Sequence, residues 1–143
     1  MADRLIPRTI HYCWFGRSKL PELVKTCMAS WRKQLPGYEI REWNEDNFNI
    51  NANVYCRQAY EMKKWAFVAD YARLAVLLEY GGLYLDTDVE VLCDLESFRQ
   101  CSLFLGMEDE TQINAAILGA RAGHPWLRQL VDHYGRRNFI TAE

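Results

Sequence analysis

The sequence predicts an α/β fold with a mostly parallel central sheet that helices cover on both faces. Segments with strand character alternate with segments of helical periodicity along the chain, which is the pattern of such folds. Half of the 143 residues are apolar, which is enough for one hydrophobic core. The longest amphipathic segment also runs through two glycines directly into a buried strand. Together these observations predict a single domain that comprises residues 1–143.

The first part of the chain has the pattern of a strand, a helix and a second strand. Residues 9–15 form a continuous apolar and aromatic run, typical of an interior strand. Residues 21–35 place apolar side chains every three or four positions, which predicts an amphipathic helix with Pro21 in its first turn. Residues 38–43 alternate enough to form the second strand. Two further segments follow, a loop or short capping helix over residues 44–53 and a short helix over residues 54–62.

The central helix is predicted over residues 66–80, and a buried strand over residues 83–85 follows it. One face of the helix carries the apolar side chains Phe67, Tyr71, Leu74, Leu77 and Leu78. Gly81 and Gly82 end the helix, because glycine takes the left-handed conformation that a tight turn needs. The sequence therefore predicts a helix joined to a strand by a minimal connection.

The remaining segments predict a return to the sheet and a closing helix. Val89 and Val91 alternate with a glutamate, which predicts a brief strand after Asp88. The later elements are a helical turn over residues 95–98, strands over residues 102–107 and 113–118, and a helix from Pro125 to about Tyr134.

Two carboxylates stand at the end of the strand over residues 83–85. Asp86 and Asp88 flank Thr87, and residues two apart on an extended chain point to the same side. Two negative groups at this spacing repel each other unless a cation lies between them, and oxygen ligands favour Mg²⁺ or Mn²⁺ over zinc. Such cations keep positions for water and substrate phosphate. A polar turn that only caps the strand is the alternative.

The residues around this pair resemble a known family. Asp70, Arg73, Tyr84, Asp86 and Asp88 match the D-x-x-R…Y-x-D-x-D pattern of glycosyltransferases that carry the DXD sugar-binding motif. The group includes bacterial capsular polysaccharide transferases, yeast-type initiating mannosyltransferases and the glucosylating domains of clostridial toxins. The opening segment, residues 6–16, also resembles the start of such bacterial transferases. These two matches span most of the first ninety or so residues.

The resemblance implies a GT-A-like (Rossmann-like) nucleotide-sugar-binding fold and a metal-dependent transferase. Such an enzyme moves a hexose from a nucleoside-diphosphate sugar to a saccharide or other acceptor, with retention of anomeric configuration in the related families. Among donors a UDP-hexose is favoured and GDP-mannose is the alternative. The implied cofactor is Mn²⁺ or Mg²⁺, and polysaccharide biosynthesis is the implied process.

The resemblance also assigns roles to the carboxylates of the motif and to the tyrosine before them. It gives Asp86 and Asp88 as the catalytic and metal-binding residues, with Asp88 as the direct ligand. Asp86 is then expected to serve the ribose and the sugar and to reach the metal through water. Tyr84 is expected to line the donor pocket.

Four further residues are expected to bind the donor. Trp14 lies at the carboxyl end of the first strand, where open α/β sheets bind ligands, and the resemblance implies that it stacks on the nucleotide base. The resemblance implies that Asp70 and Arg73 orient the sugar hydroxyls and the ribose, and that Asn114 lies near the sugar and acceptor pocket. From the residues alone, core packing of Trp14, an exposed helical ion pair and a strand-end hydrogen bond remain as alternatives.

Two other functions remain open at this level. Related enzymes carry further metal and acceptor contacts beyond the segment matched here, so the chain is either a minimal transferase or a truncated module that binds sugar nucleotides without transferring them. A hydrophobic strand followed by D-x-D also occurs in phosphohydrolases with an aspartate nucleophile. That alternative is weaker, because those enzymes usually place the motif in their first strand.

Composition excludes some functions and indicates a compartment. A net charge of −2 with no basic stripe argues against a nucleic-acid surface. The first eight residues lack the apolar core of a signal peptide, and no apolar run approaches the about eighteen residues of a membrane helix. The five cysteines include no C-x-x-C pair and are expected to be reduced and mostly buried. His11, inside the first strand, is expected to be structural, and the protein is expected to be cytoplasmic.

Overall fold

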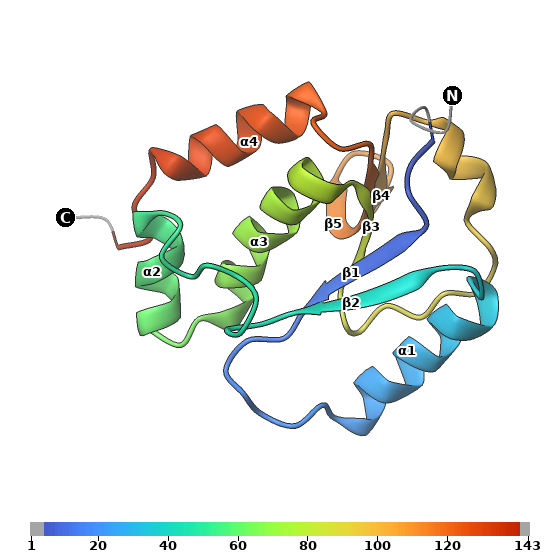
Figure 1. Cartoon of the computed structure of the whole chain (residues 1–143), viewed down its shortest axis with the longest axis horizontal. Coiled ribbons are helices and arrows are strands. Elements are labelled where there is room, and N and C mark those ends of the chain that lie inside the picture. Colours follow the sequence, from blue (N-terminus) through green and yellow to red (C-terminus); the bar gives the residue numbers. More distant parts are fainter. Residues whose placement is uncertain (1–4, 141–143) are drawn as a thin grey trace.

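The computed structural model describes residues 5–140 and contains five strands, four α-helices and a 3₁₀ helix (Figure 1). In chain order the elements are β1 (Thr9–Cys13), α1 (Glu22–Gln34), β2 (Glu39–Trp43), α2 (Val54–Glu61), α3 (Trp65–Tyr80), β3 (Gly82–Leu85), the 3₁₀ helix η2 (Glu96–Gln100), β4 (Leu103–Met107), β5 (Ile113–Ala120) and α4 (Pro125–Gly135). These elements lie within a few residues of the segments that the sequence predicts.

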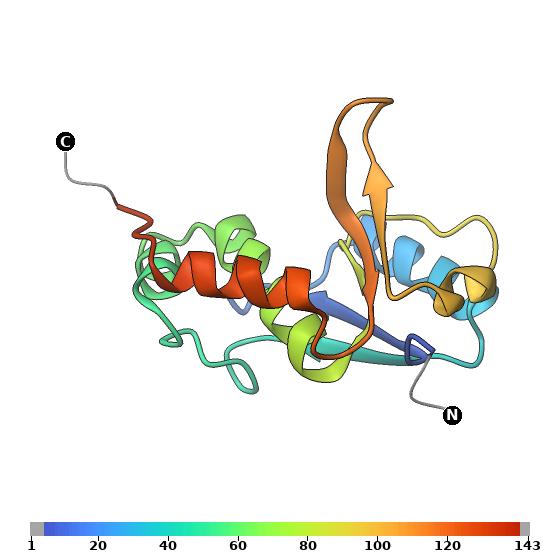
Figure 2. The same cartoon turned by 90° about the horizontal axis from the view of Figure 1, so that it is seen from above.

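The five strands form one mixed sheet in the order β2-β1-β3-β5-β4. β1 pairs in parallel with β2 and β3, whereas β5 is antiparallel to both of its neighbours, β3 and β4. Four strands therefore run in one direction and β5 runs against them. Figure 2 shows the β4–β5 hairpin rising out of the body of the domain. The predicted α/β fold with a mostly parallel sheet is confirmed, and the reversed strand is an addition that the sequence did not indicate.

Helices cover both faces of this sheet, and each face has its own hydrophobic core. On one face α1 buries Val24, Met28 and Trp31 against β1 and β3. On the other face α3 packs with α2 and α4 over the same strands (Figure 1). β1 and β3 lie between these two layers, so the ends of these strands are held rigidly.

The turn between α3 and β3 depends on its two glycines. Gly81 has φ +67° and Gly82 has φ +115°, a region that favours glycine. The Gly81 N–H donates to the Leu77 carbonyl and ends the helix. A Cβ atom on Gly82 would lie 2.6 Å from the carbonyl oxygen of Thr9. The predicted tight connection is therefore present, and close contact with β1 explains why a side chain does not fit at the second glycine.

His11 is a structural residue of this connection, as the sequence predicted. Its imidazole is fully buried, and its Nε2 lies 2.8 Å from the Gly81 carbonyl oxygen. The Trp43 indole N–H donates to His11 Nδ1 over 3.0 Å, so the neutral tautomer carries its proton on Nε2. Burial lowers the pKa of His11. One ring thus ties β2 and the end of α3 to β1.

Several local predictions are wrong. Residues 89–91 form no strand: the Val91 N–H donates to the Ser30 hydroxyl, and the Val89 carbonyl accepts from the Trp31 indole, so this segment packs on α1 instead. Leu23, one of the apolar residues whose spacing predicts the helix over residues 21–35, does not pack in the core and is 66% exposed. Cys13, Cys27 and Cys56 are buried as expected, whereas Cys93 and Cys101 are exposed.

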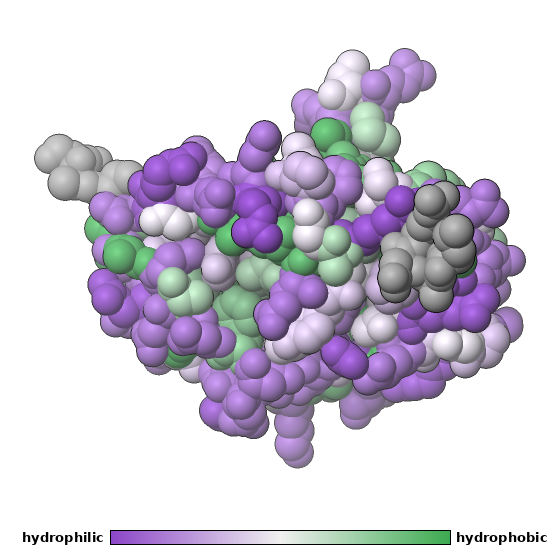
Figure 3. Space-filling view, turned by 45° about the horizontal axis from the view of Figure 1, so that its top comes forward, coloured by the Kyte–Doolittle hydropathy of each residue, from purple (hydrophilic) through white to green (hydrophobic). Residues whose placement is uncertain are grey.

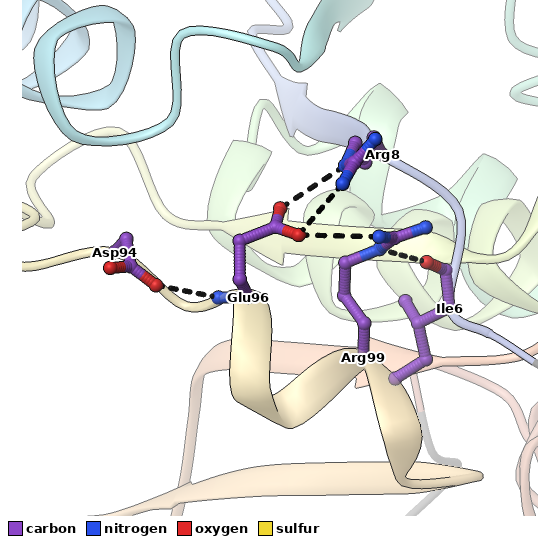
Figure 4. Close-up of polar contacts among 5 residues, drawn as sticks. All are labelled: Ile6, Arg8, Asp94, Glu96 and Arg99. Carbon is purple, nitrogen blue, oxygen red and sulfur yellow. Dashed lines mark hydrogen bonds and ion pairs between the residues drawn. The ribbon is translucent and has the colours of Figure 1, made fainter.

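An ion-pair network fastens η2 to the start of β1 (Figure 4). Arg8 donates two hydrogen bonds to the Glu96 carboxylate, from Nε over 3.2 Å and from Nη2 over 3.0 Å. Arg99 donates to the same carboxylate and, over 2.7 Å, to the Ile6 carbonyl. These partners hold the pKa of Glu96 at about 2. Because η2 lies between Asp88 and β4, the network anchors this long connecting segment to the residues before β1.

The face of the molecule in Figure 3 is mostly hydrophilic, with apolar residues visible as separate patches. None of the helices between residues 5 and 140 combines the length and the apolar character needed to cross a bilayer.

Candidate active site

A cavity opens where β1 and β3 end, at the position where α/β sheets bind ligands. It measures about 450 Å³, within the range of ligand pockets. Val24 of α1 contributes to its lining, and the other wall residues come from three segments that are far apart in the sequence. They are the end of β1 with the following loop (Cys13, Trp14, Phe15 and Ser18), the first half of α3 (Trp65, Ala66, Ala69 and Arg73) and the end of β3 (Tyr84, Asp86, Thr87 and Asp88).

Asp86 and Asp88 lie on a tight turn and both line this cavity. The Asp86 N–H donates to the Ala116 carbonyl on β5, and the Val89 N–H donates to the Asp86 carbonyl over 3.0 Å. The chain therefore turns at Thr87 and Asp88 and is not extended there. The predicted convergence of the two carboxylates on one cavity holds, but the predicted reason, an extended strand, is wrong.

Arg73 is buried, which excludes the exposed ion pair considered from the sequence. Its side chain is 8% exposed, and its Nη2 lies 3.1 Å from Asp70 Oδ1 and 3.2 Å from Asp86 Oδ1. Its Nη1 donates to the Ala115 carbonyl over 2.6 Å. The guanidinium also lies over the Tyr84 ring, 4.7 Å from the centroid. One fixed cation thus joins α3, β3 and β5 behind the carboxylates.

Asp86 retains uncompensated negative charge in spite of this arginine. Burial raises the pKa of Asp86, the Arg73 charge opposes the rise, and the neighbouring Asp88 adds to it. A further cation beside Asp86 and Asp88 would stabilise both charges, and carboxylate oxygens are the ligands that Mg²⁺ and Mn²⁺ prefer. The pair fits a divalent cation that completes its coordination with water or phosphate. Within residues 5–140, no three His, Cys, Asp or Glu side chains come close enough together to hold a metal ion.

Asp70 faces a second cavity instead of the first. This cavity measures about 330 Å³ and lies between α3, β5 and α4. Asp70 lines it together with Arg73, which lines both cavities. The Asp70 side chain is 42% exposed. Partial burial of its carboxyl group raises the pKa of that group, and the charge of Arg73 opposes the rise. The two residues of the D-x-x-R pattern therefore stand at the boundary of two cavities.

Asn114 lies next to the turn of the β4–β5 hairpin, where it pairs with Gly106, and lines neither cavity. Its Oδ1 accepts from the Ala116 N–H over 2.8 Å, next to the register shift between Leu105 and Gly106. The hydrogen bond within the strand is the one that the sequence left as the alternative role. Its neighbours Ile113 and Ala115 do line the second cavity.

Trp14 and Trp65 form the aromatic wall of the first cavity. Trp14 follows β1, and its indole N–H donates to the Ser18 carbonyl over 2.8 Å. Sequence reasoning missed Trp65, the first residue of α3, because its position near Trp14 depends on tertiary structure. Gly16 provides the space: a Cβ there would lie 2.6 Å from the Trp65 ring. Glu45 accepts hydrogen bonds from the Gly16 N–H and from Tyr60, whose ring packs 5.1 Å from Trp65.

A family model described as a glycosyltransferase sugar-binding region containing the DXD motif matches residues 21–105, more than half of the chain. The chain belongs to this glycosyltransferase family. The resemblance stated from the motif is therefore confirmed. The match also decides against the phosphohydrolase alternative.

Two curated relatives illustrate the range of the family. Inositol phosphoceramide mannosyltransferase 3 of Schizosaccharomyces pombe is 26% identical over 142 residues, which are 94% of this chain and 38% of that protein. Lactosylceramide 4-alpha-galactosyltransferase of Pan troglodytes is 35% identical over 125 residues, which are 83% of this chain and 35% of that protein. The chain thus spans little more than a third of the length of these relatives.

A solved structure titled PaToxG Glycosyltransferase has a similar fold. The two superpose with a TM-score of 0.71 at 16% sequence identity, over 95% of this chain and 64% of that chain. At this identity the likeness concerns the fold alone, and it supports the GT-A-like architecture.

Proposed function

We propose that the chain binds a nucleoside-diphosphate sugar together with Mn²⁺ or Mg²⁺ and transfers its hexose to a saccharide or other acceptor. The observation that carries the proposal is that the Asp86–Asp88 turn opens into the same cavity as Trp14 and Arg73. One cavity therefore contains carboxylates that can bind a cation, an aromatic ring that can stack on a nucleotide base, and an arginine that can bind oxygen atoms of the donor. Membership of the DXD glycosyltransferase family supports this reading.

Asp88 is the direct metal ligand in this proposal, because its side chain is exposed on the turn. Asp86 is held by Arg73 and would reach a bound cation through water, and its oxygens would also serve the ribose and the sugar. The chemistry that a cation would supply at Asp86 and Asp88 is neutralisation of charge on the departing diphosphate. Tyr84 is buried beneath Arg73 and holds the floor of the cavity.

The nucleotide base is assigned to the aromatic end of the cavity, against Trp14, with Trp65 beside it. A planar base stacks well on an indole face. A UDP-hexose is the favoured donor and GDP-mannose the alternative. Retention of anomeric configuration follows from the family resemblance, and NMR of the first-formed product tests it: an inverted anomer would remove the chain from that mechanism.

Calorimetry tests the binding step. UDP and GDP are titrated into the chain with and without Mn²⁺, and the same titrations are made with Asp88→Asn and with Asp132→Asn, an exposed aspartate on α4. Metal-dependent binding is expected to disappear in the first variant and to persist in the second. Binding that survives Asp88→Asn unchanged would contradict the metal assignment.

Binding of a sugar nucleotide without transfer is the second candidate function. The chain spans 38% and 35% of the two relatives named above, so more than half of each of these enzymes lies outside the aligned region. Transfer needs the acceptor to be held beside the donor, and lost positioning raises the barrier by several kcal/mol or so. We expect slow donor hydrolysis at most from the 143 residues. Robust transfer by this chain to a defined saccharide would show that expectation to be wrong.

A further inference from the structure

Two segments meet at one end of the molecule and form a continuous surface, which we call the α2 end. The first comprises α2, the following turn and the start of α3 (residues 54–67), and the second comprises residues 135–140 (Figures 1 and 2). Gln58 Oε1 accepts from the N–H groups of Phe139 and Ile140, each over 3.0 Å. The Phe67 ring also lies 5.1 Å from the Phe139 ring. These contacts fix the second segment against the first.

The α2 end is rich in exposed apolar side chains. Within residues 5–140, eleven large apolar side chains are more than a third exposed, and four of them belong to these two short segments. They are Val54 (40%), Met62 (48%), Phe67 (44%) and Ile140 (50%). Exposed apolar side chains that gather in one place mark a surface at which a protein meets another apolar phase or partner.

The same surface is strongly basic, although the chain as a whole carries a net charge of −2. The two segments contain five basic residues and one acidic residue, Glu61. The basic residues are all exposed: Arg57, Lys63, Lys64, Arg136 and Arg137. Within residues 5–140, only Arg57 of these five forms an ion pair, with Glu61 over 3.8 Å. The α2 end therefore presents an excess of positive charge to its surroundings.

An anionic lipid bilayer matches both properties of this surface. Lysine and arginine side chains bind anionic headgroups, while apolar side chains between them enter the boundary of the acyl chains. A bilayer also accepts apolar side chains that protrude singly, because lipids rearrange around them. A nucleic acid would match the positive charges but would leave the apolar side chains in water.

We propose that the α2 end is a peripheral docking surface for an anionic lipid bilayer, with Met62, Phe67 and Ile140 inserted among the headgroups. Trp65 and Ala66, which line the first cavity, stand between Lys64 and Phe67 in the sequence. Docking in this way brings the cavity with the DXD turn close to the lipid surface, where an acceptor attached to a lipid is presented. The docking step itself needs no donor, so it is measured independently of the proposed function.

Vesicle sedimentation tests the contribution of charge. Vesicles of phosphatidylcholine alone are compared with vesicles that contain one-third phosphatidylglycerol, in about 0.1 M salt. The unsubstituted chain is expected to bind only the anionic vesicles. Lys63→Asn with Lys64→Gln should weaken this binding roughly ten- to thirtyfold. The matched control, Arg32→Gln with Lys33→Gln, changes the net charge equally at exposed residues of the last turn of α1, away from the α2 end (Figure 1), and should bind as the parent does.

A second pair of variants tests the contribution of the apolar side chains. Met62→Ser with Ile140→Ser should weaken binding to the anionic vesicles roughly tenfold, because less apolar surface enters the bilayer. The control is Leu23→Ser with Leu92→Ser, since these leucines are 66% and 76% exposed and lie outside the two segments. It should leave vesicle binding unchanged. All substituted residues are exposed, and a thermal scan confirms that each variant is folded.

Several results would overturn the proposal. They are a lack of binding to anionic vesicles, equal binding to neutral vesicles, and equal effects of the α2-end variants and their controls. Light scattering adds a further one: a dimer that Met62→Ser with Ile140→Ser dissociates would show that this surface joins two copies of the chain instead. Because no nucleotide is present, a failure of UDP binding leaves each of these outcomes unaffected.

Discussion

Replacement of Arg73 by methionine should strongly destabilise the domain. The change removes the 2.6 Å hydrogen bond to the Ala115 carbonyl and both carboxylate contacts, while the methionine keeps much of the apolar stem. An unpaired buried carbonyl costs about 1–3 kcal/mol. Removal of one partner of a buried ion pair costs about 3–5 kcal/mol, and this is reduced here because the Asp86 side chain is 32% exposed.

The expected loss in the free energy of unfolding is therefore about 3 kcal/mol, which corresponds to a fall in Tm of roughly 10 °C for a domain of this size. Urea unfolding and a thermal scan measure it. The matched control is Arg57→Met on α2, since Arg57 is 50% exposed and its pair with Glu61 spans 3.8 Å. An exposed pair contributes about 0–1 kcal/mol, so this variant should unfold almost as the parent does.

A double-mutant cycle separates the charge effect from packing. Asp86→Asn removes the carboxylate that Arg73→Met leaves without its partner, so the second change should cost less in the methionine background than in the parent chain. A coupling free energy of about 1–2 kcal/mol is expected for groups in direct contact. If Arg73→Met is as stable as Arg57→Met, or if the two changes at the site are additive, the account of Arg73 as a buried charge link is refuted.

Three further predictions concern pH and the glycine turn. Because burial raises the pKa of Asp86, Mn²⁺-dependent UDP binding should weaken on acidification at a pH above the ordinary range of an aspartate, and calorimetry across pH 4–7 or so would expose a failure as a flat profile. His11 has a lowered pKa in the folded state, so the unfolded state binds its proton first, and stability should fall as pH drops below about 6.5. That loss should be smaller in His11→Gln, measured by urea unfolding, and an identical pH profile would argue against His11 as its source. Gly82→Ala should lower stability by about 1–3 kcal/mol or more, because its φ is +115° and the new Cβ would meet the Thr9 carbonyl, whereas Gly37→Ala, with open space around it, should not.

The order of elements could be read from the sequence because each one depends on local periodicity. α3 ends where Gly81 ends it, and β3 follows because residues 83–85 are apolar and directly adjacent. The D-x-x-R and D-x-D positions follow from the same segment, which explains why the family could be recognised from Asp70 to Asp88 alone. The strand expected over residues 89–91 failed for the opposite reason, since Ser30 and Trp31 on α1 take its hydrogen bonds.

The tertiary structure decided the environment of the motif residues, that is, which side chains surround them and which cavity they line. Asp70 and Arg73 are three apart on one helix, a spacing that is compatible with an exposed pair. Their environment instead comes from β5 and α4, which lie more than forty residues further along the chain. Trp65 joins Trp14 in one wall because Gly16 leaves space for its ring. Periodicity along one segment determines helices, strands and motif spacing. Burial, charge compensation and the division into two cavities depend instead on contacts between distant segments, and no local sequence pattern specifies those contacts.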